Sequence, residues 1–250
     1  MRPPPIIEFK NVVKRFNGLT VLNGINLSIY QGEITAIIGK SGTGKSVLLK
    51  HIIGLMESDS GTILISGNPL SEMGRDEKRR FRRELSYMFQ ENALFDSLNI
   101  FDNIALPLVE NRHYPKPEIR QKVQTRMQQL NIEGIDHKFP SELSGGMKKR
   151  VALARALVTD PNMVLFDEPT TGLDPIRKRN VHHMIQSYQK QFGFTAVIVS
   201  HDIPDIFDIA QHIAMLDNGV IEFEGTKDDV FSSRNPLVKS FIQDVDQVKK

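Results

Sequence analysis

The chain has 250 residues, 40% of them hydrophobic and 25% charged, which is ordinary for a soluble globular protein. Its formal net charge of +2 gives no electrostatic reason to expect a nucleic-acid partner. It has no cysteine, which excludes disulfides and thiolate metal sites. No apolar run approaches the roughly 20 residues that span a bilayer, and the N-terminus lacks the apolar core of a signal peptide. We therefore expect a cytosolic protein.

Strand and helix patterns follow one another along the chain. Short runs rich in β-branched residues predict strands at 6–13, 21–29, 33–38, 62–65 and 85–89. Helical patterns cover 45–53, 75–83, 100–108, 117–130, 148–158 and 175–190. Strands return at 163–166, 195–199, 213–216 and 220–224. The alternation of strand and helix predicts a parallel α/β core, and the last two strands are joined by a hairpin signal.

The first of these helices begins in a glycine-rich motif that binds phosphate. The motif G-x-x-x-x-G-K-[ST] is formed by Gly39, Lys40, Ser41, Gly42, Thr43, Gly44, Lys45 and Ser46. Its glycines let backbone N–H groups point at phosphate oxygens, and the helix adds the positive end of its dipole. We expect Lys45 to reach the β- and γ-phosphates and the Ser46 hydroxyl to bind Mg²⁺. The motif predicts binding of ATP or GTP.

We expect one domain over residues 1–250, of fold class α/β with a P-loop NTPase core. Residues from about 1 to 90 and about 160 to 250 form the core, with an antiparallel β subdomain at the front. Residues from about 91 to 160 show mostly helical periodicity and are predicted to form a helical subdomain.

Two carboxylates follow the apolar strand at 163–166. Ligands of α/β proteins lie at the carboxyl edge of the sheet, where this strand ends. Asp167 is therefore a candidate to hold Mg²⁺, and Glu168 is placed to orient and deprotonate an attacking water. An isolated acidic residue at a strand end is often only solvated, but here a P-loop lies upstream.

A second glycine-flanked helix start follows Leu143. Ser144 has the character of an N-cap, with Gly145 and Gly146 after it, which is a natural anion site or simply a well-capped helix. Together with the other motifs it identifies a family. Leu143-Ser144-Gly145-Gly146-Met147 resembles the L-S-G-G-Q signature of ABC transporter nucleotide-binding domains, with Met147 in place of glutamine.

The resemblance to this family covers essentially the whole chain and adds further site residues. Gln90 matches the Q-loop glutamine, which contacts Mg²⁺ and the water and senses the membrane subunit. Asp174, in Gly172-Leu173-Asp174-Pro175, looks like the D-loop, and His201 like the H-loop histidine that contacts the γ-phosphate. Phe16 lies where the family stacks an aromatic ring on adenine.

The family pairs two such domains head to tail. The resemblance implies a homodimer that binds ATP and Mg²⁺, in which Ser144, Gly145 and Gly146 complete the partner's site. It implies an ATPase in which Glu168 activates water while Lys45, His201 and the partner's Ser144 stabilise the developing charge. It also implies an integral-membrane permease, moved through Gln90 and its neighbours.

A narrower resemblance is to Mla/Mce-type phospholipid transporter ATPases. It rests on Met147, the run 88–103 and the segment 199–204. It implies phospholipid transport between membranes that maintains outer-membrane lipid asymmetry, with an Mce-domain lipid-binding protein as partner. The chain would then lie on the cytoplasmic face of the inner membrane, bound through its permease. The chain ends soon after Phe241, so the presence of a small regulatory subunit among its partners stays open.

Several alternatives stay open at this point. The cargo can instead be an amino acid, a metal or a lipoprotein, because a permease that this chain does not encode selects it. A soluble ABC protein of ribosomes or DNA usually has two cassettes in one chain, and a module that only binds ATP would not need both acidic residues and His201. We expect the His182-His183 pair and the cationic stretch at 75–83 to be solvated, although the latter could touch anionic lipid.

Overall fold

The part of the computed structural model that can be described, residues 3–89, 93–110, 114–203 and 205–241, contains two sheets surrounded by helices. The larger sheet has the order β10-β9-β3-β8-β7-β6. Its strands are β3 (Ile34–Ile38), β6 (Leu85–Met88), β7 (Met163–Asp167), β8 (Thr195–Ser200), β9 (His212–Asp217) and β10 (Val220–Gly225). All neighbours in this sheet pair in parallel except β9 and β10.

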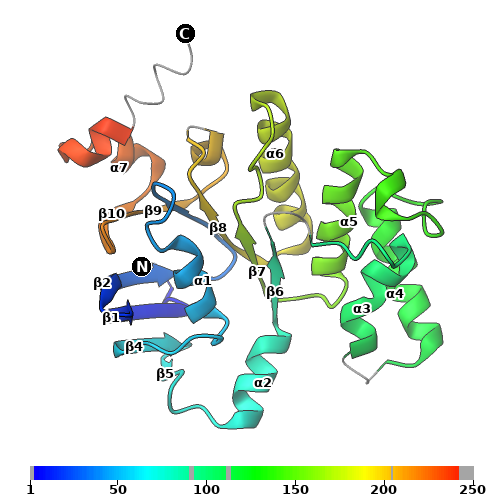
Figure 1. The fold of residues 1–250 in the computed structure, drawn as a ribbon, viewed down its shortest axis with the longest axis horizontal. Helices are drawn as coiled ribbons and strands as arrows, with labels where there is room; N and C mark the ends of the chain where they lie inside the picture. The colour runs from blue at the N-terminus through cyan, green and yellow to red at the C-terminus, as the bar shows by residue number, and fades with distance from the viewer. Residues whose placement is uncertain (1–2, 90–92, 111–113, 204, 242–250) are drawn as a thin grey trace.

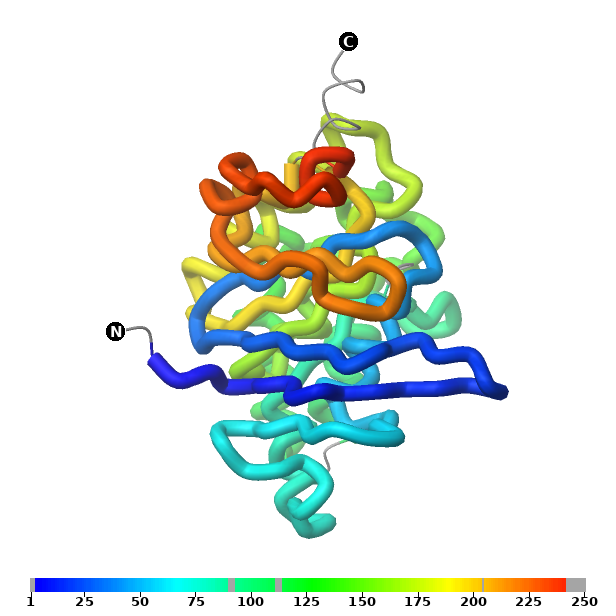
Figure 2. Tube along the Cα trace, turned by 90° about the vertical axis from the view of Figure 1, so that its left-hand side faces the viewer, coloured from blue at the N-terminus to red at the C-terminus, as the bar shows by residue number. Residues whose placement is uncertain are grey.

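The smaller sheet is antiparallel and has the order β2-β1-β4-β5. Its strands are β1 (Ile7–Phe16), β2 (Leu19–Ile29), β4 (Ser60–Ile65) and β5 (Asn68–Pro69). Figure 2 shows β1 and β2 as a long hairpin that runs across the molecule. The turn between them contains Asn17 and Gly18, both with positive φ, as two-residue hairpin turns require.

Helices surround the sheets. Those with described bounds are α1 (Lys45–Ile52), α2 (Arg75–Arg83), α3 (Ile100–Glu110), α4 (Lys116–Gln129), α5 (Gly145–Leu157), α6 (Pro175–Phe192) and α7 (Lys227–Ser232), and residues 236–241 are helical as well. In Figure 1, α3, α4 and α5 lie together on one side, beyond β6. The expected division into core and helical subdomains stays a prediction. No helix among the described residues is long and apolar enough to cross a membrane.

The central strands are apolar on both faces because both faces are covered. Every residue of β3 and β8 is buried. Alternate residues of β3 serve different cores: Ala36 and Ile38 belong to the core that includes α3 and α5, whereas Ile37 belongs to the core that includes α1 and the smaller sheet. Successive side chains of a strand point to opposite faces of the sheet, so one strand packs against the layers on both sides.

The predicted elements agree with the structure in type, and the differences are mainly at their ends. The first strand continues to Phe16 rather than stopping at Val13, and α5 begins at Gly145, three residues before the predicted start. β5 and α7 were not predicted. α7 is short, and its start is fixed by a local capping box in which the Thr226 hydroxyl accepts from the Asp229 N–H.

The expectation that both His182 and His183 are solvated is wrong for His182. Its residue surface is 1% exposed, and neither ring nitrogen has a hydrogen-bond partner, whereas His183 is exposed. Burial lowers the pKa of His182 to about 4, and the charges of Asp205 and Asp202 oppose this only in part. The imidazole is therefore held neutral inside the fold.

This burial predicts a loss of stability in acid. Between about pH 6.5 and 4 the unfolded chain binds a proton at His182 that the folded chain does not, so the free energy of unfolding falls as pH falls. We expect His182 to contribute a loss of about 2 kcal/mol between pH 7.5 and pH 5. Urea unfolding at both pH values should show this loss reduced in His182→Leu and retained in His183→Gln. An equal pH dependence in both variants would contradict the prediction.

Candidate functional site

The phosphate-binding motif forms a tight loop between β3 and α1. Gly42 and Gly44 have φ values of 82° and 101°, a left-handed region that glycine adopts without strain. The Gly39 N–H donates to the Ser200 carbonyl at 3.3 Å, and a Cβ at Gly39 would lie 2.3 Å from the Leu216 carbonyl oxygen. Neighbouring strands therefore hold the start of the loop, and its two later glycines give the curvature that the motif predicted.

Lys45, the first residue of α1, points into this loop. Its residue surface is 5% exposed, and its Nζ donates to the carbonyls of Gly39 at 2.8 Å and Lys40 at 2.9 Å. The same nitrogen lies 3.3 Å from Oε1 of Glu168. The ammonium group thus lies among the loop carbonyls and beside the carboxylate that was predicted as the base.

Ser46 and Asp167 meet across 121 positions of sequence. The Ser46 hydroxyl donates to Oδ1 of Asp167 at 2.9 Å, and the Tyr87 hydroxyl donates to Oδ2 at 2.6 Å. A hydroxyl and a carboxylate are the hard oxygen donors that Mg²⁺ prefers, and the rest of its coordination usually comes from water and phosphate. The donor set fits Mg²⁺, with Ser46 and Asp167 as the residues that would hold it.

Glu168 has a constrained backbone and a carboxylate with several partners. Its φ of 51° is unusual for a residue other than glycine, and its N–H donates to the Val199 carbonyl at 3.0 Å. Besides Lys45, the carboxylate accepts from the Thr171 hydroxyl at 3.2 Å and contacts Nδ1 of His201 closely. The structure therefore brings Lys45, Glu168 and His201 together.

Asp202 follows His201 and joins the site to α6. It accepts from the Thr170 hydroxyl at 2.6 Å and from the ammonium of Lys178. Burial alone would raise the pKa of Asp202, but the hydrogen bonds from Lys178 and Thr170 lower it, so the group is ionised at neutral pH. Neither Asp202 nor Tyr87 is assigned a role by a sequence motif, because only the folded sheet places them here.

The predicted signature lies at the start of α5. Ser144 is the N-cap, its Oγ accepts from the Met147 N–H at 3.4 Å, and Gly145 and Gly146 are exposed with open space around them. A hollow of about 420 Å³ adjoins them between α5 and α6. Among the described residues, no hydrogen bond joins the signature to the P-loop of the same chain.

Lys149, one turn further along α5, is buried and donates to the Pro169 carbonyl at 2.5 Å. Burial lowers the pKa of this lysine. Pro169 directly follows Glu168, so the signature helix is tied to the loop that carries the proposed base.

Two further predicted residues lie at the ends of other elements. Asp174 is the N-cap of α6 and accepts from the Arg177 N–H at 3.0 Å. Phe16 ends β1 with 39% of its residue surface exposed, which suits a ring that stacks on a ligand. Gln90 lies outside the described residues.

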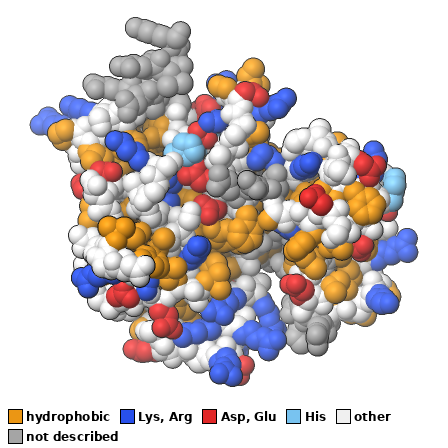
Figure 3. All heavy atoms as spheres, in the orientation of Figure 1, with side chains coloured by type: hydrophobic (Ala, Val, Ile, Leu, Met, Phe, Trp, Pro, Cys, Tyr) orange, Lys and Arg blue, Asp and Glu red, His pale blue; other side chains and the backbone are white. Residues whose placement is uncertain are grey.

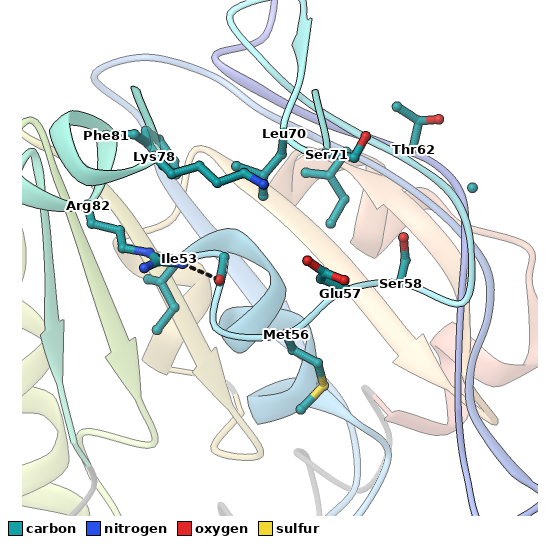
Figure 4. A pocket seen from close by; sticks show the side chains of 13 residues that line it. Ile53, Met56, Glu57, Ser58, Thr62, Leu70, Ser71, Lys78, Phe81 and Arg82 are labelled. Carbon is teal, nitrogen blue, oxygen red and sulfur yellow. Dashed lines mark hydrogen bonds between the residues drawn. The ribbon is translucent and has the colours of Figure 1, made fainter. Parts of the chain in front are cut away.

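A separate hollow of about 340 Å³ lies between the end of α1 and α2 (Figure 4). Arg82 crosses it to donate to the carbonyls of Ile53 at 3.1 Å and Gly54 at 2.6 Å. No residue of α2 is buried, and Figure 3 shows cationic side chains gathered at this edge of the molecule. This agrees with the expectation of a solvated helix.

Comparison with known proteins points to one family. A family model described as "ABC transporter" matches residues 22–171. A Mycobacterium leprae protein named "Probable ribonucleotide transport ATP-binding protein mkl" is 38% identical over 94% of this chain and 68% of its own length. A Haemophilus influenzae protein named "Intermembrane phospholipid transport system ATP-binding protein MlaF" is 35% identical over 95% of this chain and 90% of its own length.

Solved structures of similar fold belong to the same family. One is cbiO1 from Clostridium perfringens, described as part of an ABC transporter complex, with a TM-score of 0.84 and 29% identity over 96% of this chain and 100% of that chain. Another is a dimeric cassette, MJ0796, in a post-hydrolysis state bound to ADP and Pi. It has a TM-score of 0.75 and 30% identity over 88% of this chain and 98% of that chain.

The position of Lys45 predicts that its removal weakens nucleotide binding. In Lys45→Ala the P-loop keeps its backbone N–H groups but loses the buried ammonium of this lysine, which we expect to cost at least tenfold in affinity. Titration with a fluorescent ATP analogue measures this directly. Lys50→Ala, at an exposed position of the same helix, is the matched control and should bind as the unaltered chain does. Equal affinity in both variants would contradict the prediction.

Proposed function

We propose that this chain, which belongs to the ABC transporter family and is an ATPase subunit, drives the movement of phospholipid between membranes. The observation that carries the cargo is the similarity to MlaF, a protein named as the ATP-binding protein of an intermembrane phospholipid transport system. The two chains are 35% identical over 95% of this chain and 90% of MlaF.

In the proposed reaction the chain's own residues position ATP and a water molecule. The P-loop N–H groups and Lys45 bind the phosphates, and Ser46 and Asp167 would hold Mg²⁺, which supplies charge neutralisation at the γ-phosphate when bound. Glu168 accepts the proton of the attacking water, and its contact with His201 keeps the carboxylate oriented. Lys45 and His201 then stabilise the charge that develops on the transferred phosphoryl group.

The site is completed in this proposal by a second copy of the chain. Ser144, Gly145 and Gly146 present a free helix N-terminus at the surface, which is suited to an anion. Head-to-tail pairing would bring this terminus to the nucleotide of the partner copy. The dimeric form of the similar cassette MJ0796 supports the pairing.

The proposed assembly further includes an integral-membrane permease and an Mce-domain lipid-binding protein. The chain would bind the permease at the cytoplasmic face of the inner membrane, with Gln90 and its neighbours at the contact. The similarity to cbiO1, described as part of a transporter complex, supports a permease partner.

A second candidate cargo is a ribonucleotide, because mkl carries that word in its name and is 38% identical to this chain. The ATPase mechanism is the same for both cargoes. The phospholipid and ribonucleotide proposals differ only in the permease and in the presence of a lipid-binding partner.

We expect Glu168→Gln to retain ATP binding and lose activity. The amide keeps the size of the side chain and one acceptor oxygen but cannot accept the proton, so turnover should fall at least a hundredfold. Phosphate release measures turnover, and the fluorescent analogue measures binding. Glu133→Gln, at an exposed position, is the control. Unchanged phosphate release from Glu168→Gln would reject this glutamate as the base.

The cargo is tested by purifying the tagged chain from its native membranes in mild detergent and identifying its partners by mass spectrometry. We expect a multispanning permease together with an Mce-domain protein. A permease without any lipid-binding protein would reject the phospholipid cargo and keep the transporter. Recovery of only ribosomal or DNA-bound proteins would contradict the transporter.

A further inference from the structure

Tyr87 lies beside the proposed Mg²⁺ site although no motif includes it. It belongs to β6, which pairs in parallel with β7 so that Tyr87 lies opposite Leu165. Residues two apart on a strand share a face, so Asp167 projects from the same face as Leu165. The tyrosine is therefore diagonal to Asp167 across the pair of strands, and its hydroxyl donates to Oδ2 at 2.6 Å.

The environment of Tyr87 fixes the position of this hydroxyl. The side chain is half-buried and packs against the core of α1 and the smaller sheet. Its ring also contacts the ring of Phe89, with centroids 4.5 Å apart.

The two oxygens of Asp167 have different partners. Oδ1 accepts from Ser46 and Oδ2 from Tyr87. The Ser46 hydroxyl has two lone pairs besides its proton, so its oxygen can bind a cation while it still donates to Asp167. Both hydrogen bonds can therefore persist when Mg²⁺ binds, and the one from Tyr87 comes from a residue outside the predicted motifs.

We propose that Tyr87 is a positioning residue that holds the carboxylate of Asp167 in the orientation required to bind Mg²⁺ with nucleotide. The inference rests on the proposed function, since it assigns a supporting group to the same site. Tyr87 also lies three positions before Gln90. The hydrogen bond therefore connects the proposed cation site with the strand that leads into the predicted permease contact.

The test is the Mg²⁺ dependence of nucleotide binding in Tyr87→Phe, which removes one hydroxyl and keeps the ring. A fluorescent ATP analogue is held at fixed concentration while Mg²⁺ is titrated, and its affinity is also measured in EDTA. Loss of a group that orients a metal ligand typically costs at least tenfold in metal affinity, so we expect the Mg²⁺ midpoint to rise roughly tenfold. Binding in EDTA should be unchanged.

Two further variants sharpen the result. Tyr188→Phe, a buried tyrosine on α6 whose ring stacks with Phe192, should leave the midpoint unchanged. In an Asp167→Asn background, Tyr87→Phe should add little further shift, because the carboxylate that it positions is already gone.

Each contrary outcome has a separate meaning. An unchanged Mg²⁺ midpoint in Tyr87→Phe overturns the inference. Weaker binding in EDTA and with Mg²⁺ alike also overturns it, because the tyrosine would then be only structural. If the unaltered chain binds nucleotide with no dependence on Mg²⁺, the Mg²⁺ site of the proposed function fails, and the role of Tyr87 fails with it.

Discussion

The parallel pairing of β3, β8 and β7 is the constraint on which the rest of the site depends. Ile38 lies opposite Ser200, and Val199 lies opposite Asp167, so all three strands end at one edge. Lys45 and Glu168 are far apart in the sequence, yet this register brings their side chains to 3.3 Å. The strands are buried on both faces, and a slip of one residue would exchange side chains between the two cores and disrupt the packing of both. Packing of the cores therefore also fixes the geometry of the charged groups.

The two carboxylates of the site, Glu168 and Asp202, each have more than one polar neighbour. Glu168 lies between Lys45 and His201, and Asp202 lies between His201 and Lys178. Removing one member would leave a partly buried charge without its partner, which costs far more than the net contribution of the pair. The left-handed backbone at Glu168 adds strain of the kind that clusters at functional sites. The arrangement favours precise positions over maximal stability.

The sequence predicted what is local, and it missed what depends on tertiary packing. The bounds of α2 and the sites at the strand ends followed from periodicity and motifs, because these signals are contained within a few residues. The hydrogen bond of Tyr87 joins positions 80 apart, and only the order of the strands makes them neighbours. Likewise α5 includes Gly145 and Gly146, whose low helix propensity is offset by the Ser144 cap and by burial of the rest of the helix. His182 was misjudged because its helix packs on η2 (Asp205–Asp208), a contact that no spacing reveals.

The bond between Lys149 and the Pro169 carbonyl has a consequence for a pair of copies. Within one chain it links the helix that carries Ser144 to the loop that carries Glu168. In a head-to-tail pair that helix would face one nucleotide and that loop the other. A buried lysine that donates to a backbone carbonyl transmits displacement in either direction, since stretching it leaves a desolvated charge unsatisfied. The two sites of such a pair would then be mechanically linked through each subunit. A displacement caused by hydrolysis at one nucleotide would shift the groups that contact the other nucleotide.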